Sequence, residues 1–208
     1  MLLVTGCKLP RISDTVVGAS YSPQNVHRSS DWLTSNIRRV AVLPVTCDHT
    51  QNQVEAGRDL LELVLPEELG KIKKFELIPV PPEKLRQWTG RPTWTAEEQL
   101  PVDFFKTLRD ELGCEAVLFC RVTQFHAYPP LVVGLQLKLV GAEHAQVLWA
   151  VDEVIDAAEP TVVNGARRYQ QAQEQLPGAL ADSRSILNSP RRFGRYAAST
   201  LFATLPER

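Results

Sequence analysis

Three consecutive residues, Cys47, Asp48 and His49, form the only compact group of reactive side chains in this 208-residue chain. A cysteine thiol beside an imidazole base is the pairing used in nucleophilic hydrolysis, provided that the two side chains lie within hydrogen-bond reach. Adjacent positions in a chain rarely supply that geometry. The favoured interpretation is therefore a polar loop that caps the next helix. A small soluble enzyme of the hydrolase type that uses Cys47 and His49 is the alternative.

The other candidate metal ligands are scattered. The four cysteines, at positions 7, 47, 114 and 120, form no CxxC pair, and no histidine lies at zinc-finger spacing from them. Nothing in the sequence fixes His126, Glu143 and His144 together as a metal site. The chain carries no phosphate-binding glycine loop and no nucleophile elbow. We therefore expect no catalytic residue, no metal and no cofactor.

Arginines gather where the last helix is expected to begin. Arg191, Arg192 and Arg195 would place positive charge at the positive end of the helix dipole, which is unfavourable unless an anion lies nearby. These three residues are predicted to contact an anionic partner or a lipid head group. Replacing all three with glutamine should leave the melting temperature unchanged or slightly higher and weaken partner capture in a salt-dependent way. The alternative is a solvated basic face in which Arg184 and its neighbours pair locally with Asp182.

Two tryptophans, Trp88 and Trp94, lie in a segment rich in proline and threonine. Exposed tryptophans are frequent anchors of protein–protein interfaces, so both residues are candidates for a recognition patch. The alternative is that their rings close the edge of the core.

Composition limits the function classes. The chain is 44% hydrophobic and 23% charged, as in an ordinary globular protein, and its formal net charge of −1 provides no general attraction to nucleic acid or anionic membranes. No apolar run reaches the roughly 18–20 residues that span a bilayer. Membrane attachment would therefore need a lipid or a partner protein, and nucleic acid is not expected as a ligand.

Apolar patterns predict the first half of the fold. Residues 39–45 form a nearly continuous apolar run, typical of a strand buried on both faces. Apolar residues at helical spacing from Leu60 to Leu69 predict a helix that Pro66 must kink or end. A second strand is expected over residues 75–80. Thr95 and Glu98 have the spacing of a capping box, which predicts that a helix begins at Thr95.

The second half of the sequence predicts three strands and a helix. A hairpin of strands over 116–128 and 131–140 is followed by a third strand over 146–155, where Trp149 is expected to be buried. The closing helix is expected to start at Ser189 and to carry one apolar stripe made of Phe193, Tyr196, Ala197, Leu201 and Leu205. The element order indicates one α/β domain over residues 38–208, with a mixed sheet flanked by helices.

The first seven residues end in Leu3-Val4-Thr5-Gly6-Cys7, which resembles a bacterial lipobox. The resemblance implies that residues 1–7 are a truncated signal, that Cys7 carries a lipid, and that residues 8–37 form a tether. Only six residues precede Cys7, fewer than a secretory signal needs, so it also implies a start upstream of Met1. By analogy with the enteric sorting pattern, Lys8 implies the outer membrane. The alternative is an apolar amino terminus with a buried cysteine.

Three further motifs, in order, carry a family resemblance. They are Arg39–Val45, read as an opening (K/R)-V-A-V-L-P strand, Leu112–Leu118, read as L-G-A-D-A-V-L, and Val147–Trp149, read as V-L-W. Together they resemble the TolB amino-terminal-like fold, shared by the curli-secretion lipoprotein CsgG and the penicillin-binding-protein activator LpoB. That family works by binding and assembly, and no catalytic residues come with it. Unlike CsgG, this chain has no spare segment for a pore.

Together, these resemblances favour a non-enzymatic lipoprotein of the cell envelope. It would face the periplasm and act as an interaction or assembly module. The implied partners are the membrane, through the lipid on Cys7, and one or more envelope proteins. Homo-oligomers, for example through sheet-edge pairing, are left open.

Overall fold

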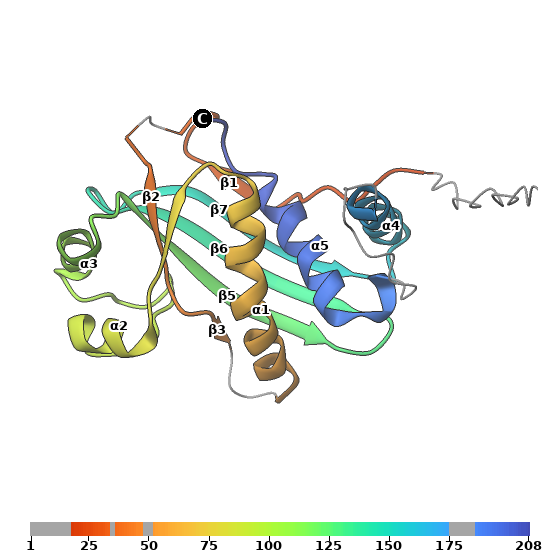
Figure 1. Cartoon of the computed structure of the whole chain (residues 1–208), viewed down its shortest axis with the longest axis horizontal. Coiled ribbons are helices and arrows are strands. Elements are labelled where there is room, and N and C mark those ends of the chain that lie inside the picture. The colour runs from red at the N-terminus through yellow and green to blue at the C-terminus, as the bar shows by residue number, and fades with distance from the viewer. Residues whose placement is uncertain (1–17, 34–35, 48–51, 175–185) are drawn as a thin grey trace, which may run out of the picture.

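A computed structural model describes residues 18–33, 36–47, 52–174 and 186–208. Its centre is a seven-stranded sheet in the order β1-β7-β6-β5-β2-β4, with β3 paired to β5 (Figure 1). Pairing is parallel among β2, β3, β4 and β5 and antiparallel among β5, β6, β7 and β1. The strands are β1 (Val26–Arg28), β2 (Arg39–Val42), β3 (Thr46–Cys47), β4 (Glu76–Pro79), β5 (Ala116–His126), β6 (Val132–Gly141) and β7 (Val147–Asp156).

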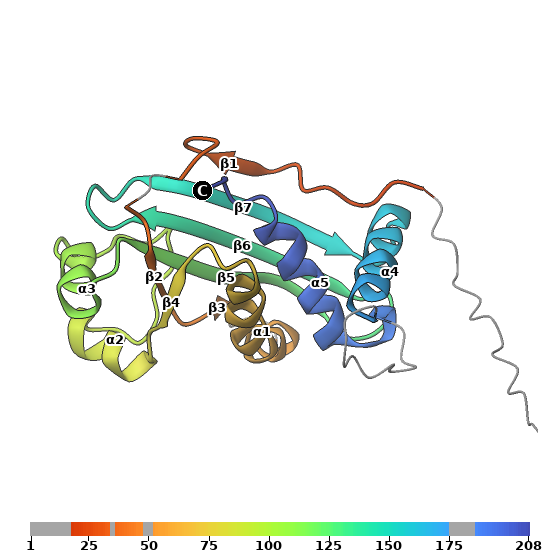
Figure 2. The same ribbon diagram turned by 45° about the horizontal axis from the view of Figure 1, so that its top comes forward.

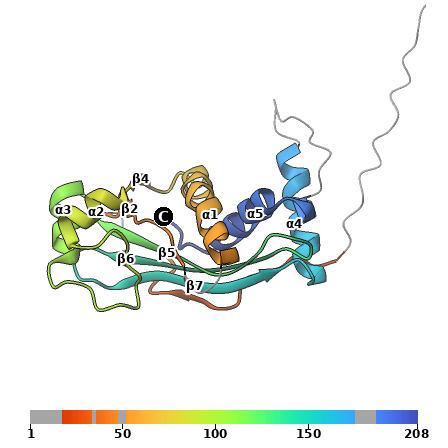
Figure 3. The same ribbon diagram turned by 90° about the horizontal axis from the view of Figure 1, so that it is seen from below.

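Helices cover the sheet unequally. In the view of Figure 3, α1, α4 and α5 lie on the same side of the three long strands, while α2 and α3 gather at one end of the sheet. Their bounds are α1 (Asn52–Lys71), α2 (Pro82–Thr89), α3 (Phe104–Leu112), α4 (Pro160–Glu174), the short 3₁₀ helix η1 (Ile186–Asn188) and α5 (Pro190–Phe202). The predicted class, a mixed α/β sheet flanked by helices, is confirmed.

Strand alternation divides the core into two clusters. Leu118 of β5 and Leu137 of β6 pack in the cluster that includes α1 and α5, with Trp149 of β7. Val117 and Phe119 of β5 point to the other face and pack with residues of α2 and α3. Because successive side chains of a strand alternate between faces, one strand supplies both clusters.

The segment predicted as a tether, residues 8–37, belongs to the fold wherever the structure describes it. Val26 pairs with Val151, so β1 extends the sheet beyond β7, and Leu33 and Ile37 are buried in the main core. The predicted domain start at residue 38 is therefore too late. The polar, proline-containing sequence resembled a linker because an edge strand buries few side chains. Cys7 and the rest of residues 1–17 lie outside the described residues.

In two places, packing overrides the local sequence signal. Pro66 removes one backbone donor, yet α1 continues through it, with Leu65 and Leu69 buried on either side. The backbone N–H of Thr95 does donate to the Glu98 carboxylate at 2.9 Å, but it does so in a turn. The helix begins at Phe104, so the predicted N-cap is wrong.

Candidate interaction sites

Cys47 lies in the core. It ends β3, its side chain is 8% exposed, and it belongs to the apolar cluster that also contains Val54 and Val122. A cysteine nucleophile needs an accessible thiol beside a base. Among the described residues, Cys47 therefore occupies the position of a structural cysteine. Asp48 and His49 lie outside the described residues.

The two histidines considered as metal ligands, His126 and His144, are far apart. His126 ends β5, where its Nδ1 lies 3.0 Å from the carbonyl oxygen of Pro130, whereas His144 lies beyond the far end of β6. The ten residues of β6 separate the two ends by about 30 Å. Among the described residues, no three cysteine, histidine or acidic side chains are grouped so that they could hold a metal ion.

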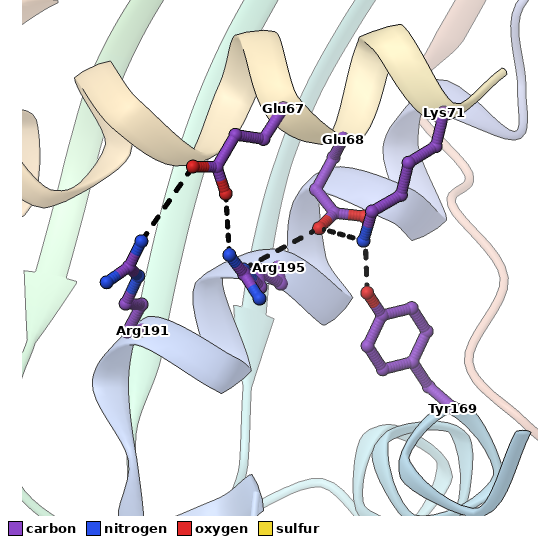
Figure 4. A network of polar contacts seen from close by, with 6 residues as sticks. All are labelled: Glu67, Glu68, Lys71, Tyr169, Arg191 and Arg195. Carbon is purple, nitrogen blue, oxygen red and sulfur yellow. Dashed lines mark hydrogen bonds and ion pairs between the residues drawn. The ribbon is translucent and has the colours of Figure 1, made fainter. Parts of the chain in front are cut away.

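The arginines of α5 face acidic residues of α1 (Figure 4). Arg195 donates to the Glu67 carboxylate at 2.6 Å, and its Nε lies 3.8 Å from Glu68. Arg191 is 3.8 Å from the same Glu67 and is more exposed. Arg192, which is half-buried, has contacts of its own. The anion that the helix start requires is therefore supplied from within the chain for Arg191 and Arg195. Asp182 and Arg184 lie outside the described ranges.

Glu68 is the centre of this ion-pair network. Its carboxylate is only 2% exposed, and it accepts hydrogen bonds from Lys71 at 2.6 Å and from the Tyr169 hydroxyl at 3.2 Å. Burial, followed by the charge of Glu68, raises the pKa of Tyr169. A buried carboxylate is tolerated when it is paired and hydrogen-bonded, which Lys71, Tyr169 and Arg195 accomplish together. The network joins α1, α4 and α5.

The two tryptophans belong to the smaller core cluster. Trp94 is 7% exposed, its indole N–H donates to Thr89 Oγ1 at 2.8 Å, and the Arg91 guanidinium lies 4.4 Å from its ring centroid. Trp88 is half-buried against the same cluster. A recognition patch needs exposed rings. Trp94 therefore fits the alternative interpretation, in which the ring closes the edge of the core.

A polar surface lies on the opposite side of the sheet from α1 and α5. Strand pairing places Arg121 beside Gln136, Gln136 beside Asp152 and Gly134 beside Val154, all on one face. We call this surface the open face. Its members are Arg121, Thr123, Gly134, Gln136, Lys138, Ala150, Asp152 and Val154.

The open face has unfilled hydrogen-bonding capacity. Gln136 donates to Asp152 at 3.1 Å, but its carbonyl oxygen Oε1 and the Thr123 hydroxyl are buried without hydrogen-bond partners in the described chain. Val154 is 41% exposed among these polar groups. Buried polar atoms without partners are costly, so a surface that concentrates them is a candidate for contact with another molecule. Sequence reasoning did not find this surface, because its members come from three strands.

Comparison with known proteins gives a fold-level likeness. No family model matches the chain, and no curated protein matches it. Among solved structures, lipoprotein GNA1162 from Neisseria meningitidis is 17% identical, with 57% of this chain and 79% of that chain covered and a TM-score of 0.41. The PelC dodecamer from Paraburkholderia phytofirmans is 13% identical, with coverages of 88% and 98% and a TM-score of 0.44.

The LpoB C-terminal domain from Salmonella enterica is also similar, at 17% identity, with 57% of this chain and 82% of that chain covered and a TM-score of 0.38. At these identities and TM-scores, the neighbours assign no functional residue in this chain. In the described residues, no helix is long and apolar enough to cross a membrane.

Proposed function

We propose that this protein is a non-enzymatic module of the cell envelope and is anchored through a lipid on Cys7. The module binds another envelope protein through the open face. The observation that carries the binding role is the exposed Val154 on a polar face, beneath which the polar atoms of Thr123 and Gln136 are buried without partners in the described chain. Gln136 Oε1 is buried within the chain, so a partner could donate to it only after the side chains that cover it have moved. The burial of Cys47 argues against the hydrolase alternative.

The path of the chain indicates how an anchored domain would be oriented. Gly18, the first described residue, lies against α4, where Arg168 donates to its carbonyl oxygen at 2.6 Å (Figure 2). Ten residues, 8–17, separate it from Cys7, and an extended chain of that length reaches at most about 35 Å. The end of the domain that carries α4 would therefore be the end nearer to the lipid.

A crosslinking experiment tests the binding role. A photoreactive residue placed at Val154 should capture a partner in intact envelopes. The matched control is Leu63 of α1, which is 63% exposed and lies on the helix-covered side of the sheet. Equal capture from both positions, or no capture from position 154, would rule out the open face as the binding surface. A product of twice the mass of the chain would show instead that the partner is a second copy.

Metabolic labelling tests the anchor. A fatty-acid analogue should tag the full-length protein but not its Cys7→Ala variant, because the thiol of Cys7 is the proposed site of lipid attachment. Equal labelling of both proteins, or labelling of neither, would refute lipidation at Cys7. Fractionation of the labelled protein would then report whether it reaches the outer membrane.

A further inference from the structure

The loop between β5 and β6 exposes an aromatic residue followed by two prolines. Tyr128 is 71% exposed, and Pro129 and Pro130 are exposed beside it. We call residues 128–130 the apolar loop. The loop is supported from β5, because His126 Nδ1 lies 3.0 Å from the carbonyl oxygen of Pro130 and the His126 ring packs edge-on against Tyr128, with 6.4 Å between the ring centroids. Its apolar surface is therefore held out toward the surroundings of the protein.

The apolar loop lies at the same end of the sheet as α4 and the amino-terminal segment. The backbone N–H of Ala157, in the turn that leads from β7 into α4, donates to the carbonyl oxygen of Leu131 at 2.8 Å. The backbone N–H of Tyr21 donates to the carbonyl oxygen of Thr161, in the first turn of α4, at 2.9 Å. Figure 2 shows the amino-terminal segment passing α4 at this end of the sheet. The apolar loop and the start of the described chain therefore belong to one end of the domain.

The length of the segment between Cys7 and Gly18 limits which end of the domain can reach a membrane. If Cys7 carries a lipid, residues 8–17 allow Gly18 to lie at most about 35 Å from the bilayer. The opposite end of the sheet, where α2 and α3 lie, is about 30 Å from the apolar loop, because β6 has ten residues. That end could meet the bilayer only with the segment almost fully extended along the domain, which costs conformational entropy. The end that carries the apolar loop faces the lipid without this cost.

The chemistry of the apolar loop fits the interface between lipid head groups and acyl chains. Tyrosine is enriched at that interface, because its ring is apolar and its hydroxyl can bond to water or to phosphate oxygens. Proline has no backbone N–H, so two prolines in succession remove two donors that would lose water on entering a lipid layer. The side chains of the loop include only one polar group, the Tyr128 hydroxyl, so little hydration is lost on contact.

The surroundings of the loop give it no strong electrostatic attraction of either sign. Exposed charges at this end include Glu159, immediately before α4, and Arg167 within α4. The contact therefore depends on the small apolar area of the loop and is weak by itself. An anchor raises the effective concentration of the bilayer at the loop, so that even a weak contact is occupied.

We propose that the apolar loop rests on the phospholipid surface, with the Tyr128 ring and the two prolines at the level of the head groups. This contact depends on the proposed function, because the lipid on Cys7 is the anchor that brings the bilayer to this end of the domain. The open face lies along one side of the sheet. The same module can therefore rest on the membrane through the loop and bind a partner protein through the open face.

Quenching of tryptophan fluorescence by brominated lipid tests the contact. The full-length protein is coupled through the Cys7 thiol to a maleimide phospholipid in vesicles of brominated phosphatidylcholine. The described cysteines, at positions 47, 114 and 120, are buried, which favours coupling at Cys7. Tyr128→Trp should lose fluorescence beyond the loss seen in the unmodified protein, and bromines near the head groups should quench it more than bromines near the chain ends. The matched control, Val102→Trp, should show no such loss, because Val102 is fully exposed beside α3 at the opposite end.

Equal loss from the two positions, or no loss from Tyr128→Trp, would overturn the proposal. A Cys7→Ala/Tyr128→Trp protein has no thiol at position 7 and should show no loss, since the loop binds weakly without an anchor. Quenching of that protein would contradict the dependence on the anchor. Because the coupling supplies the lipid chemically, the result does not depend on whether the cell lipidates Cys7. Metabolic labelling answers that question separately, so failure of the loop contact and failure of the anchor are distinguishable.

Discussion

Trp149 shows how one residue ties the sheet to the end of the chain. Its indole is fully buried and donates to Thr204 Oγ1 at 3.0 Å, and that hydroxyl in turn donates to the carbonyl oxygen of Leu201 at 2.7 Å. Its ring centroid lies 6.1 Å from that of Phe202 in α5. The side chain thus supplies both apolar contact and a satisfied polar group.

We expect Trp149→Ala to lower the free energy of unfolding by about 3–5 kcal/mol, because it removes a large buried ring and leaves Thr204 without its donor. Chemical denaturation measures this loss. Trp88→Ala, at a half-buried position, should cost less. Equal unfolding midpoints for Trp149→Ala and the unmodified protein would mean that the position of Trp149 in the sheet is wrong.

The buried thiols predict an alkaline limit to stability. Burial raises the pKa of Cys114 and of Cys120, so the folded protein keeps protons that the unfolded chain releases from about pH 8.5 upward. Their contribution to stability is complete below that pH and is lost as the pH rises. Denaturation at pH 7.5 and pH 10 should show the loss, and a Cys114→Ala/Cys120→Ala variant should show less of it. An unchanged pH dependence in that variant would assign the loss to other groups.

At the scale of elements, replacing two glycines of α1 would distinguish the effect of helix propensity from the effect of packing. A Cβ atom at Gly57 would lie 2.4 Å from the Phe125 ring, whereas at Gly70 the nearest atom, from Leu77, would be 3.9 Å away. Gly57→Ala should therefore destabilise by about 1–3 kcal/mol through overpacking. Gly70→Ala should stabilise by about 0.5–1 kcal/mol, as alanine replaces glycine within a helix. Thermal melts of the two variants measure the difference, and shifts of the same sign would contradict the α1–β5 packing.

The ion-pair network between α1 and α5 changes the expectation for the arginines. Arg195→Gln should cost about 1–2 kcal/mol, because Glu68 is buried and keeps only Lys71 as a nearby cation among the described residues. Arg191→Gln, at the exposed pair, should cost about 0–1 kcal/mol. Urea unfolding of both variants tests this ranking, and equal costs would show that Glu68 does not depend on Arg195.

At the scale of the whole molecule, the amino-terminal segment closes one edge of the sheet. The Glu153 carboxylate on β7 accepts from Tyr21, Gln24 and Asn25, and the backbone N–H of Leu33 donates to the carbonyl oxygen of Glu207 at 2.7 Å. The pairing of β1 with β7 and the contacts to Glu153 occupy the β7 edge, which an unprotected sheet would offer to another chain.

A protein that begins at residue 38 should therefore be less stable than one that begins at residue 18, and it should associate through the uncovered β7 edge. Light scattering and thermal melts of the two proteins measure both effects. Identical melting temperatures and a monomer in both cases would show that β1 is dispensable, as the original tether interpretation requires.

Sequence alone determined the local elements whose signals are carried by neighbouring residues. The alternation from Leu131 to Leu139 predicted β6, and the stripe from Phe193 to Leu205 predicted α5 and its buried face, because these periodicities follow directly from backbone geometry. Tertiary structure decided the rest. Three features join residues that are distant in the chain: the pairing of Arg195 with Glu67, the addition of β1 to β7, and the open face. No local pattern encodes such contacts, since they exist only once helices and strands have packed.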